Sequence, residues 1–350
     1  MAVFAREKYE MIEKQLILED DSVIHYAEGP DNGPALLLLH GQQVSWEDYR
    51  KVLPELSKQF HVFAVDYYGH GGSSKDPAKY TAKAIGTDLL FFLKTVIKKK
   101  PVIAGHSSGA LLAAWIAGND PDGVAGIVLE DGPFFSTEKG RAEHTFAWLG
   151  FEVIHRFLQE EETNYTLYSL EHHYMQTLFN QNGKDNWERI VLNPAKKYMK
   201  KHPGTIPKIW YYPKKLGINS IYALTANLQD GTGDYDLRFG ETFYDFSWFA
   251  GFDQEETLSK ITCPALVLHV APGKATAPGY YDKNGILLSA MDEKDAARVT
   301  ELIKNSEYAG GFASMHNIHD DLPEAYIDQL LAFKERLAQR FGNRVAQTGK

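Results

Sequence analysis

The stretch from Pro101 to Trp115 constrains the fold of this chain more than any other. It opens with a short apolar run, passes through Gly105-His106-Ser107-Ser108-Gly109, and continues into a segment rich in Ala and Leu. The apolar run predicts a buried strand, and the Ala- and Leu-rich segment predicts a helix. A serine between two glycines at such a strand-to-helix turn is typical of a nucleophile elbow, and glycine tolerates the crowded reversal because it has no Cβ. We therefore take Ser107 as the candidate nucleophile.

Further apolar runs alternate with predicted helices on both sides of this elbow. This alternation predicts an α/β fold with a doubly wound, mostly parallel sheet, in which ligand sites lie at the carboxyl ends of the strands. The pair of runs at 15–19 and 22–27 predicts a hairpin that adds an antiparallel edge. Four polar residues fall at predicted carboxyl ends: His40, Asp66, Ser107 and Asp131.

From about Gly132 to Glu256 the pattern changes, because strand alternation stops and aromatic residues and histidines gather. This composition predicts helices and loops inserted after the sixth strand. We expect a core domain of residues 1–133 and 258–350 and a mainly helical cap of residues 134–257. The aromatic residues, Trp148 and Trp248 among them, are expected to line an apolar chamber above the site.

Composition narrows the classes of partner. The 350 residues carry a net charge of −9 and no basic block stands out, so nucleic acid and anionic membrane surfaces are not expected partners. A single cysteine, Cys263, excludes an intrachain disulfide. No run approaches the roughly 18 apolar residues of a membrane span, and the first residues lack an apolar signal core, so we expect a cytoplasmic protein. The oligomeric state stays open.

Two local patterns carry more specific expectations. Ser45, followed three residues later by Asp48, resembles a capping box and predicts a helix from Trp46 to Lys58. The acidic stretch 229–236 lacks the ordered spacing of a calcium loop and predicts a turn.

Four motifs in order give the chain a family resemblance: Leu39-His40-Gly41, the Gly-rich stretch 66–73, the elbow 105–109, and a late His316 before the final helix. With these motifs the chain resembles the α/β-hydrolase superfamily in its capped, esterase-like branch. The resemblance covers about residues 15–133 and 258–340.

The resemblance implies a role for each matching residue. Ser107 would be the nucleophile and His316 the general base that activates it. The backbone N–H groups of Gln42 and Ser108 would form the oxyanion hole. No cofactor is implied. A metal held by His316 and His319 has no HExxH frame to support it, so no metal is expected.

The acid that partners His316 is the open position. Many relatives place it after the strand occupied here by 266–270, where this chain offers no carboxylate before Asp282. Other members place it after the preceding strand, where Glu130 and Asp131 stand. We favour Asp131 because a strand end holds geometry better than a loop, with Asp282, Glu130 and Asp292 left as alternatives.

The expected activity is hydrolysis of a small carboxylic ester with an apolar group, through an acyl-enzyme on Ser107. Hydrolysis of a carbon–carbon bond by the same three residues is the alternative enzyme class, and a non-catalytic ligand-binding protein is the alternative outside enzymes. Dehalogenase and epoxide hydrolase activity is disfavoured, because the family's version of those enzymes needs Asp where Ser107 stands.

Overall fold

The computed structural model describes residues 10–180, 183–203, 235–272 and 279–348, and they contain one eight-stranded sheet. The strand order is β1-β2-β4-β3-β5-β6-β7-β8. β2 pairs antiparallel with β1 and β4, whereas all other neighbours are parallel, which confirms the predicted sheet and its antiparallel edge. The strands are β1 (Ile12–Ile17), β2 (Val23–Glu28), β3 (Ala35–Leu39), β4 (His61–Asp66), β5 (Val102–His106), β6 (Gly126–Glu130), β7 (Ala265–Val270) and β8 (Ser306–Phe312).

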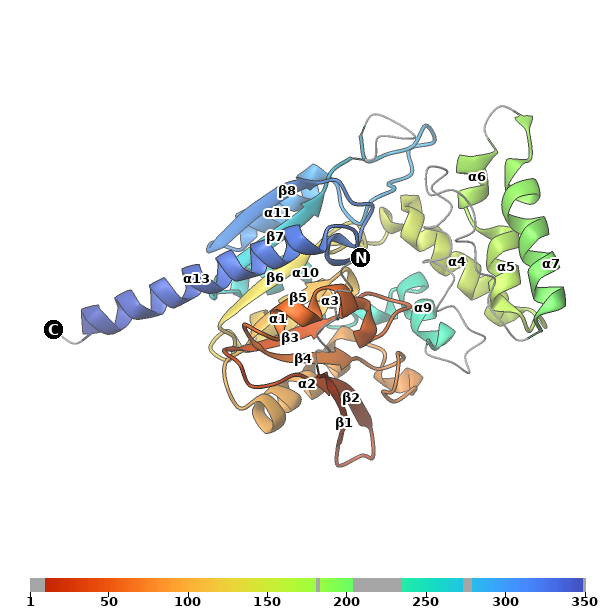
Figure 1. Cartoon of the computed structure of the whole chain (residues 1–350). Helices are drawn as coiled ribbons and strands as arrows, with labels where there is room; N and C mark the ends of the chain where they lie inside the picture. The colour runs from red at the N-terminus through yellow and green to blue at the C-terminus, as the bar shows by residue number, and fades with distance from the viewer. Residues whose placement is uncertain (1–9, 181–182, 204–234, 273–278, 349–350) are drawn as a thin grey trace, which may run out of the picture.

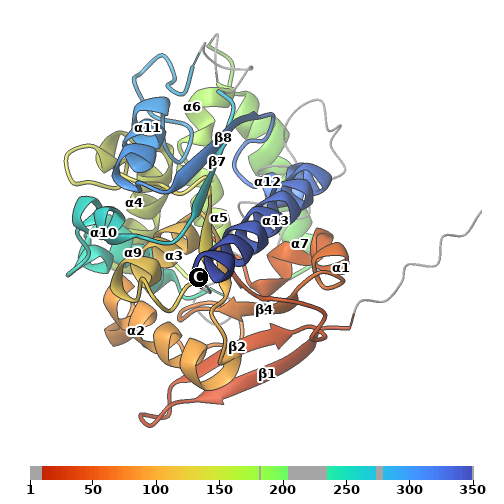
Figure 2. The same ribbon diagram turned by 90° about the vertical axis from the view of Figure 1, so that its left-hand side faces the viewer.

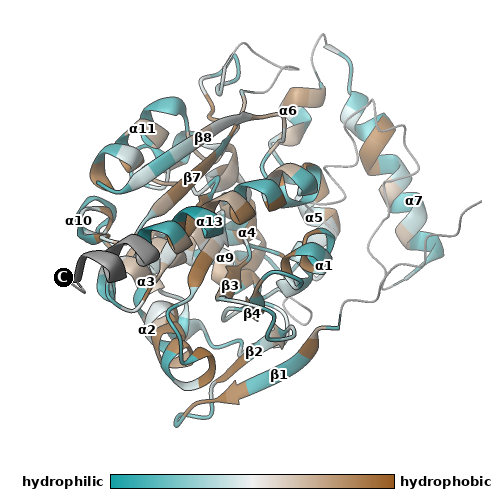
Figure 3. Ribbon diagram, turned by 60° about the vertical axis from the view of Figure 1, so that its left-hand side comes forward, coloured by the Kyte–Doolittle hydropathy of each residue, from teal (hydrophilic) through white to brown (hydrophobic). Residues whose placement is uncertain are grey.

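Helices cover both faces of this sheet (Figures 1 and 2). Alternate residues of β3 enter opposite cores: Leu37 belongs to the core that includes residues of α2, α3, α10 and α11, and Leu38 to the core that includes residues of α1 and α13. In Figure 3 the central strands are brown and the outer sides of α11 and α13 are largely teal, as this layering requires. The helical segments around the sheet are η1 (Trp46–Lys51), α1 (Leu53–Leu56), η2 (Pro77–Lys79), α2 (Ala82–Phe92), η3 (Leu93–Ile97), α3 (Ser108–Asn119), α10 (Gln254–Lys260), α11 (Glu293–Leu302), α12 (Ile318–Asp321) and α13 (Pro323–Thr348).

Between β6 and β7 the described chain forms helices and turns, and Figure 1 shows α4 to α7 gathered beyond one end of the sheet. One small core here, around Trp187 and Leu170, is separate from the two cores that flank the sheet. The helical segments of this region are η4 (Ala142–His144), α4 (Phe146–Gln159), α5 (Tyr165–His172), α6 (Met175–Phe179), η6 (Glu188–Leu192), α7 (Asn193–Lys201), α9 (Leu237–Tyr244) and η8 (Ser247–Phe249).

The predicted helix from Trp46 to Lys58 is wrong in detail. A 3-10 segment, η1, is followed by the short helix α1, and Ser45 makes no side-chain capping bond. The Asp48 carboxylate bonds His319 instead, so a tertiary contact has replaced the local capping box. The acidic stretch predicted as a turn lies outside the described residues except for its last two positions.

Candidate active site

The elbow holds Ser107 in a backbone conformation that few non-glycine residues adopt. Its φ is 55° and its ψ is −122°, and α3 starts at the next residue. A Cβ on Gly105 would lie 2.1 Å from the carbonyl oxygen of Gly109, so the glycine is required there. The Ser107 N–H donates to the carbonyl of Glu130 (2.9 Å), which ties the elbow to the end of β6. Ser107 is partly accessible while its neighbours are buried, as a nucleophile requires.

The chain that follows β3 passes close beside this serine. A Cβ on Gly41 would lie 3.2 Å from the Ser107 Cβ and 2.9 Å from His106 Nδ1, so a larger residue would push the two segments apart. On the other side, Ser108 is the first residue of α3, where N–H groups lack helical partners and the helix dipole favours an anion. The Gln42 side chain is held by the Tyr235 hydroxyl, which donates to Oε1 (2.9 Å). The two segments predicted to supply oxyanion donors therefore both lie at the nucleophile.

His316 and Asp131 are 185 residues apart in sequence and are joined by a hydrogen bond. His316 Nδ1 lies 2.6 Å from Asp131 Oδ2. The Asp131 side chain is fully buried, whereas the His316 side chain is 36% exposed. Asp131 follows β6 directly, with φ at 42°, and its N–H donates to the carbonyl of Leu268 (2.8 Å). A buried carboxylate thus orients an imidazole that remains open to solvent on its other side.

The other candidate acids have different partners. Asp282 accepts from the Tyr174 hydroxyl (2.6 Å), and Asp292 caps α11 and accepts from the Tyr281 hydroxyl (2.6 Å). Glu130 accepts from His319. Within the described part of the chain, Asp131 is the carboxylate that bonds His316.

A second histidine flanks Asp131 on its far side. His269 Nε2 lies 4.0 Å from Asp131 Oδ1 and 3.1 Å from the carbonyl of Met291, to which it donates. His269 is not among the site residues predicted above, although a histidine inside the apolar run 265–270 was the available signal.

Two further histidines lie behind His316. These are His106 and His319. The ring of His106 lies between the other two, with its centroid 4.4 Å from that of His316 and 5.0 Å from that of His319. Burial lowers the pKa of His106 well below its ordinary value, and the neighbouring His316 lowers it further, so this ring is a neutral packing group. It separates the solvent-accessible histidine from the buried one.

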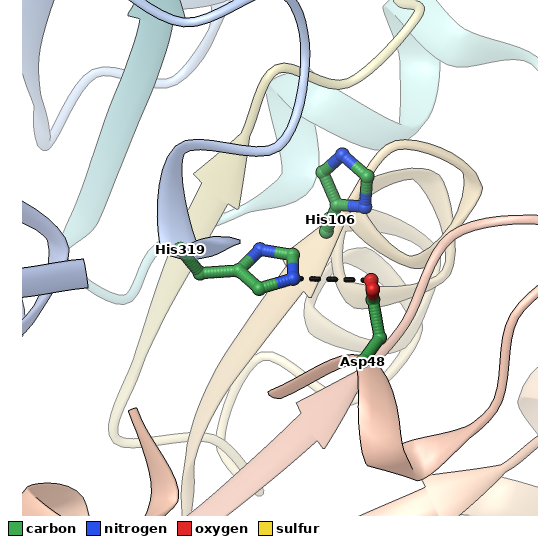
Figure 4. Close-up of side chains that lie close together, drawn as sticks. All are labelled: Asp48, His106 and His319. Carbon is green, nitrogen blue, oxygen red and sulfur yellow. Dashed lines mark hydrogen bonds and ion pairs between the residues drawn. The ribbon is translucent and has the colours of Figure 1, made fainter. Parts of the chain in front are cut away.

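His319 is fully buried between two carboxylates. Nδ1 lies 2.8 Å from Glu130 Oε2, and Nε2 lies 3.0 Å from Asp48 Oδ2. Burial opposes protonation, but the charges of Glu130 and Asp48 outweigh it and raise the pKa of His319 to about 10. Figure 4 shows the rings of His319 and His106 beside the Asp48 carboxylate, and their donor atoms lie within 4.8 Å of one another.

His40, just after β3, and Asp66, at the end of β4, make hydrogen bonds that connect the loops at this edge of the sheet. Asp66 accepts from the Trp46 N–H (2.6 Å) and from His25 Nδ1 (2.8 Å). His40 is fully buried, stacks on Tyr67 and donates from Nδ1 to the Gly41 carbonyl (2.6 Å). Burial lowers the pKa of His40, so it is neutral at pH 7. These contacts fix the loops that approach Ser107.

The aromatic residues of the inserted region do not share one role. Trp148 lines a pocket with Phe151 and Phe243, and neither Ser107 nor His316 lines it. Trp248 is fully buried against Phe243, Phe249 and Phe252, so its expected place in a chamber is wrong and it belongs to the core. In the described chain no helix combines the length and the apolar character needed to cross a membrane.

Comparison with known proteins adds three observations. A family model described as "alpha/beta hydrolase fold" matches residues 34–285. Fluoroacetate dehalogenase of Burkholderia sp is 31% identical over 128 residues, which are 35% of this chain and 42% of that protein. The 2-(acetamidomethylene)succinate hydrolase of Mesorhizobium japonicum is 32% identical over 108 residues, which are 31% of this chain and 39% of that protein. The matches to these curated relatives thus span about two fifths of their length.

Among solved structures, an esterase from Exiguobacterium antarcticum superposes with a TM-score of 0.60. The match covers 92% of this chain and 99% of that one at 16% identity. At this identity the likeness describes the fold.

Proposed function

The chain belongs to the alpha/beta hydrolase fold family, and from this premise we propose that it is a serine hydrolase acting on carboxylic esters. The observation that supports this most is the Asp131–His316 hydrogen bond beside an elbow serine. A serine hydroxyl is a weak nucleophile at neutral pH and needs an oriented base. The buried carboxylate fixes the imidazole so that Nε2 is free to act as that base.

The proposed reaction has two halves. Ser107 Oγ attacks the ester carbonyl as His316 Nε2 takes the hydroxyl proton, and the backbone N–H groups of Gln42 and Ser108 receive the oxyanion. His316 then gives the proton to the departing alkoxide, which leaves as the alcohol while the acyl group stays on Ser107. Water, activated by His316, attacks the acyl-enzyme and releases the carboxylic acid. The residues named here suffice for each step, without a cofactor or metal.

The proposed substrate is a small molecule with an apolar group. The region between β6 and β7 follows Asp131 in the chain and is rich in aromatic residues, Trp148 among them. Trp148 lines a pocket that neither Ser107 nor His316 lines. The composition of the region, and not that pocket, therefore supports an apolar group on the substrate, since small ligands usually bind among apolar side chains.

A second candidate is cleavage of a bond other than an ester, and the carbon–carbon bond of a diketone is the alternative expected from the sequence. The similar protein named 2-(acetamidomethylene)succinate hydrolase supports a bond other than an ester, because the substrate in its name carries an acetamido group. The serine at position 107 argues against the dehalogenase chemistry named for another relative. Identification of the products distinguishes the two bond types.

The test of the proposed function is covalent labelling of Ser107. We expect a fluorophosphonate probe to add one phosphonyl group to Ser107, detected by mass spectrometry. Ser107→Ala should abolish labelling and hydrolysis of p-nitrophenyl esters of graded acyl length. Its melting temperature should stay close to that of the wild type, because the change removes one oxygen and no core packing. Near-normal hydrolysis by Ser107→Ala would contradict the assignment.

A further inference from the structure

The loop that carries His316 is held by polar contacts at its surface: Asp321 accepts from the Ser314 hydroxyl (2.7 Å) and from the Met315 N–H (3.3 Å). Residues 313–317 alternate between exposed and half-buried, whereas Ile318 and His319, at the start of α12, are buried. A catalytic base must be held within a fraction of an ångström. Besides Asp131, which bonds the His316 ring, the buried start of α12 is therefore a part of the chain able to set where His316 lies.

The contacts at this point come from two distant elements. Glu130, the last residue of β6, accepts from both the backbone N–H and Nδ1 of His319 (each 2.9 Å to Oε1). Asp48, on η1, binds Nε2 from the opposite side at 3.0 Å. Three donor groups of His319, its backbone N–H and its two ring nitrogens, are thereby bound by two carboxylates, which fixes its position and its ring orientation.

Glu130 also touches the other two parts of the proposed machinery. Its carbonyl accepts the Ser107 N–H, and the next residue, Asp131, binds His316. One strand end therefore supports the nucleophile through its backbone, the base through Asp131, and the segment after the base through the Glu130 carboxylate.

We propose that Glu130, His319 and Asp48 form a positioning clamp, which sets the place of His316 relative to Ser107 without touching substrate. The clamp rests on the proposed function, since it acts through the base of that reaction. It explains why two acidic side chains are committed to a buried histidine that takes no part in the chemical steps.

The clamp needs its charges. An imidazole donates from both ring nitrogens only when it is protonated, and His319 faces a carboxylate at each. A buried ion array of this kind becomes unfavourable when one partner is removed, because the remaining charge is left unpaired. A neutral amide in place of Glu130 should therefore loosen the segment that carries His316 even though it fills the same space.

A divalent cation held by Asp48, His106 and His319 is the competing explanation for the cluster, since their donor atoms lie within 4.8 Å of one another. Such an ion would need the lone pair of the His319 nitrogen that faces Asp48. In the clamp this nitrogen carries a proton instead.

The experiment compares Glu130→Gln with a matched control, Glu28→Gln. Glu28 also binds a histidine from a strand, at 2.9 Å from His61 Nε2, but on β2 and away from the elbow. We measure kcat and KM with a p-nitrophenyl ester, the rate of fluorophosphonate labelling, and the melting temperature. For Glu130→Gln we expect kcat and the labelling rate to fall about 10²-fold, the loss typical of a misplaced catalytic group, with KM unchanged. Glu28→Gln should match the wild type in both rates.

If Glu130→Gln fails to fold, the same measurements are made on Asp48→Asn, which removes the charge at the other ring nitrogen of His319. A folded clamp variant with wild-type kcat overturns the proposal, as does an equal loss in the Glu28→Gln control. A stoichiometric divalent metal in the purified wild type, absent from Asp48→Asn, also overturns it in favour of a metal site. A wild type that neither labels at Ser107 nor hydrolyses esters refutes the proposed function itself, an outcome distinct from failure of the clamp alone.

Discussion

Two histidine–carboxylate arrays lie next to each other in this protein, and they differ in exposure. Asp131 and His316 form a single hydrogen bond, and the His316 ring is 36% exposed. Glu130, Asp48 and His319 form an array in which the imidazole has no exposure at all. Both arrays use neighbouring residues at the end of β6 and histidines three positions apart. Access to solvent decides what each imidazole can do: the exposed His316 ring can exchange a proton with a substrate in the proposed reaction, and the buried His319 ring can only hold neighbouring groups in place.

The largest expected effect is a loss of activity when the hydrogen bond between Asp131 and His316 is changed. Asp131→Asn should lower kcat by about 10⁴, the loss found for the corresponding change in a serine protease, because the amide leaves the imidazole in the wrong tautomer. Asp282→Asn is the control, since Asp282 binds Tyr174 and backbone N–H groups. Steady-state kinetics of both variants with a p-nitrophenyl ester test this. A larger loss in Asp282→Asn, with both proteins folded, would move the acid to the loop after β7.

Disruption of the buried array of Glu130, Asp48 and His319 should lower the free energy of unfolding. Asp48→Ala leaves the buried His319 charge with one partner, so we expect the free energy of unfolding to fall by about 3 kcal/mol. Asp320→Ala is the matched control, because Asp320 pairs with Lys51 near the surface and such pairs contribute about 0–1 kcal/mol. Urea denaturation of the two variants measures the difference. Equal losses would show that burial does not separate the two kinds of pair.

Per pH unit, the smallest effect is the dependence of stability on pH. The pKa of His319 is raised from an ordinary 6.5 to about 10, so its contribution is complete below pH 6.5 and is lost as pH rises toward 10. The wild-type free energy of unfolding should therefore decline across this window, by at most about 1.4 kcal/mol per pH unit. In Glu130→Gln the decline should be shallower, because the amide no longer favours the imidazolium. Denaturation midpoints from pH 6.5 to 9.5 give the slopes, and identical slopes would contradict the assigned charge state.

The sequence predicts the sheet and the elbow well because their signals are local. An apolar run, two glycines and an Ala-rich helix stand within fifteen residues. Gly105 is needed for the crowding expected within the turn, whereas Gly109 makes room for the carbonyls of Leu39 and His40 at the end of β3. The preference for Asp131 over Asp282 rests on a similar local fact, the end of a strand. Its catalytic role remains a prediction until Asp131→Asn is measured.

The buried array of Glu130, Asp48 and His319 could not be predicted from local sequence patterns. Asp48 and His319 are 271 residues apart, and the local pattern around Asp48 indicates a capping box that the fold does not use. The Asp48 carboxylate binds His319 rather than the start of the helix, because a carboxylate stabilises a buried imidazolium more than it stabilises an exposed helix end. Trp248 shows the same limit, since no local pattern tells an aromatic residue of a core from one of a pocket.

The backbone at Ser107 and Asp131 has a consequence for the stability of the fold. Both residues adopt positive φ values, 55° and 42°, in which a glycine would be more comfortable. Conformations of this kind cost about 1–3 kcal/mol each. Glycine would relieve the backbone strain at either position, but it would also remove the hydroxyl or the carboxylate on which the proposed reaction depends. The strain at Ser107 and Asp131 is thus a local cost in stability that the proposed reaction accounts for and that folding does not require.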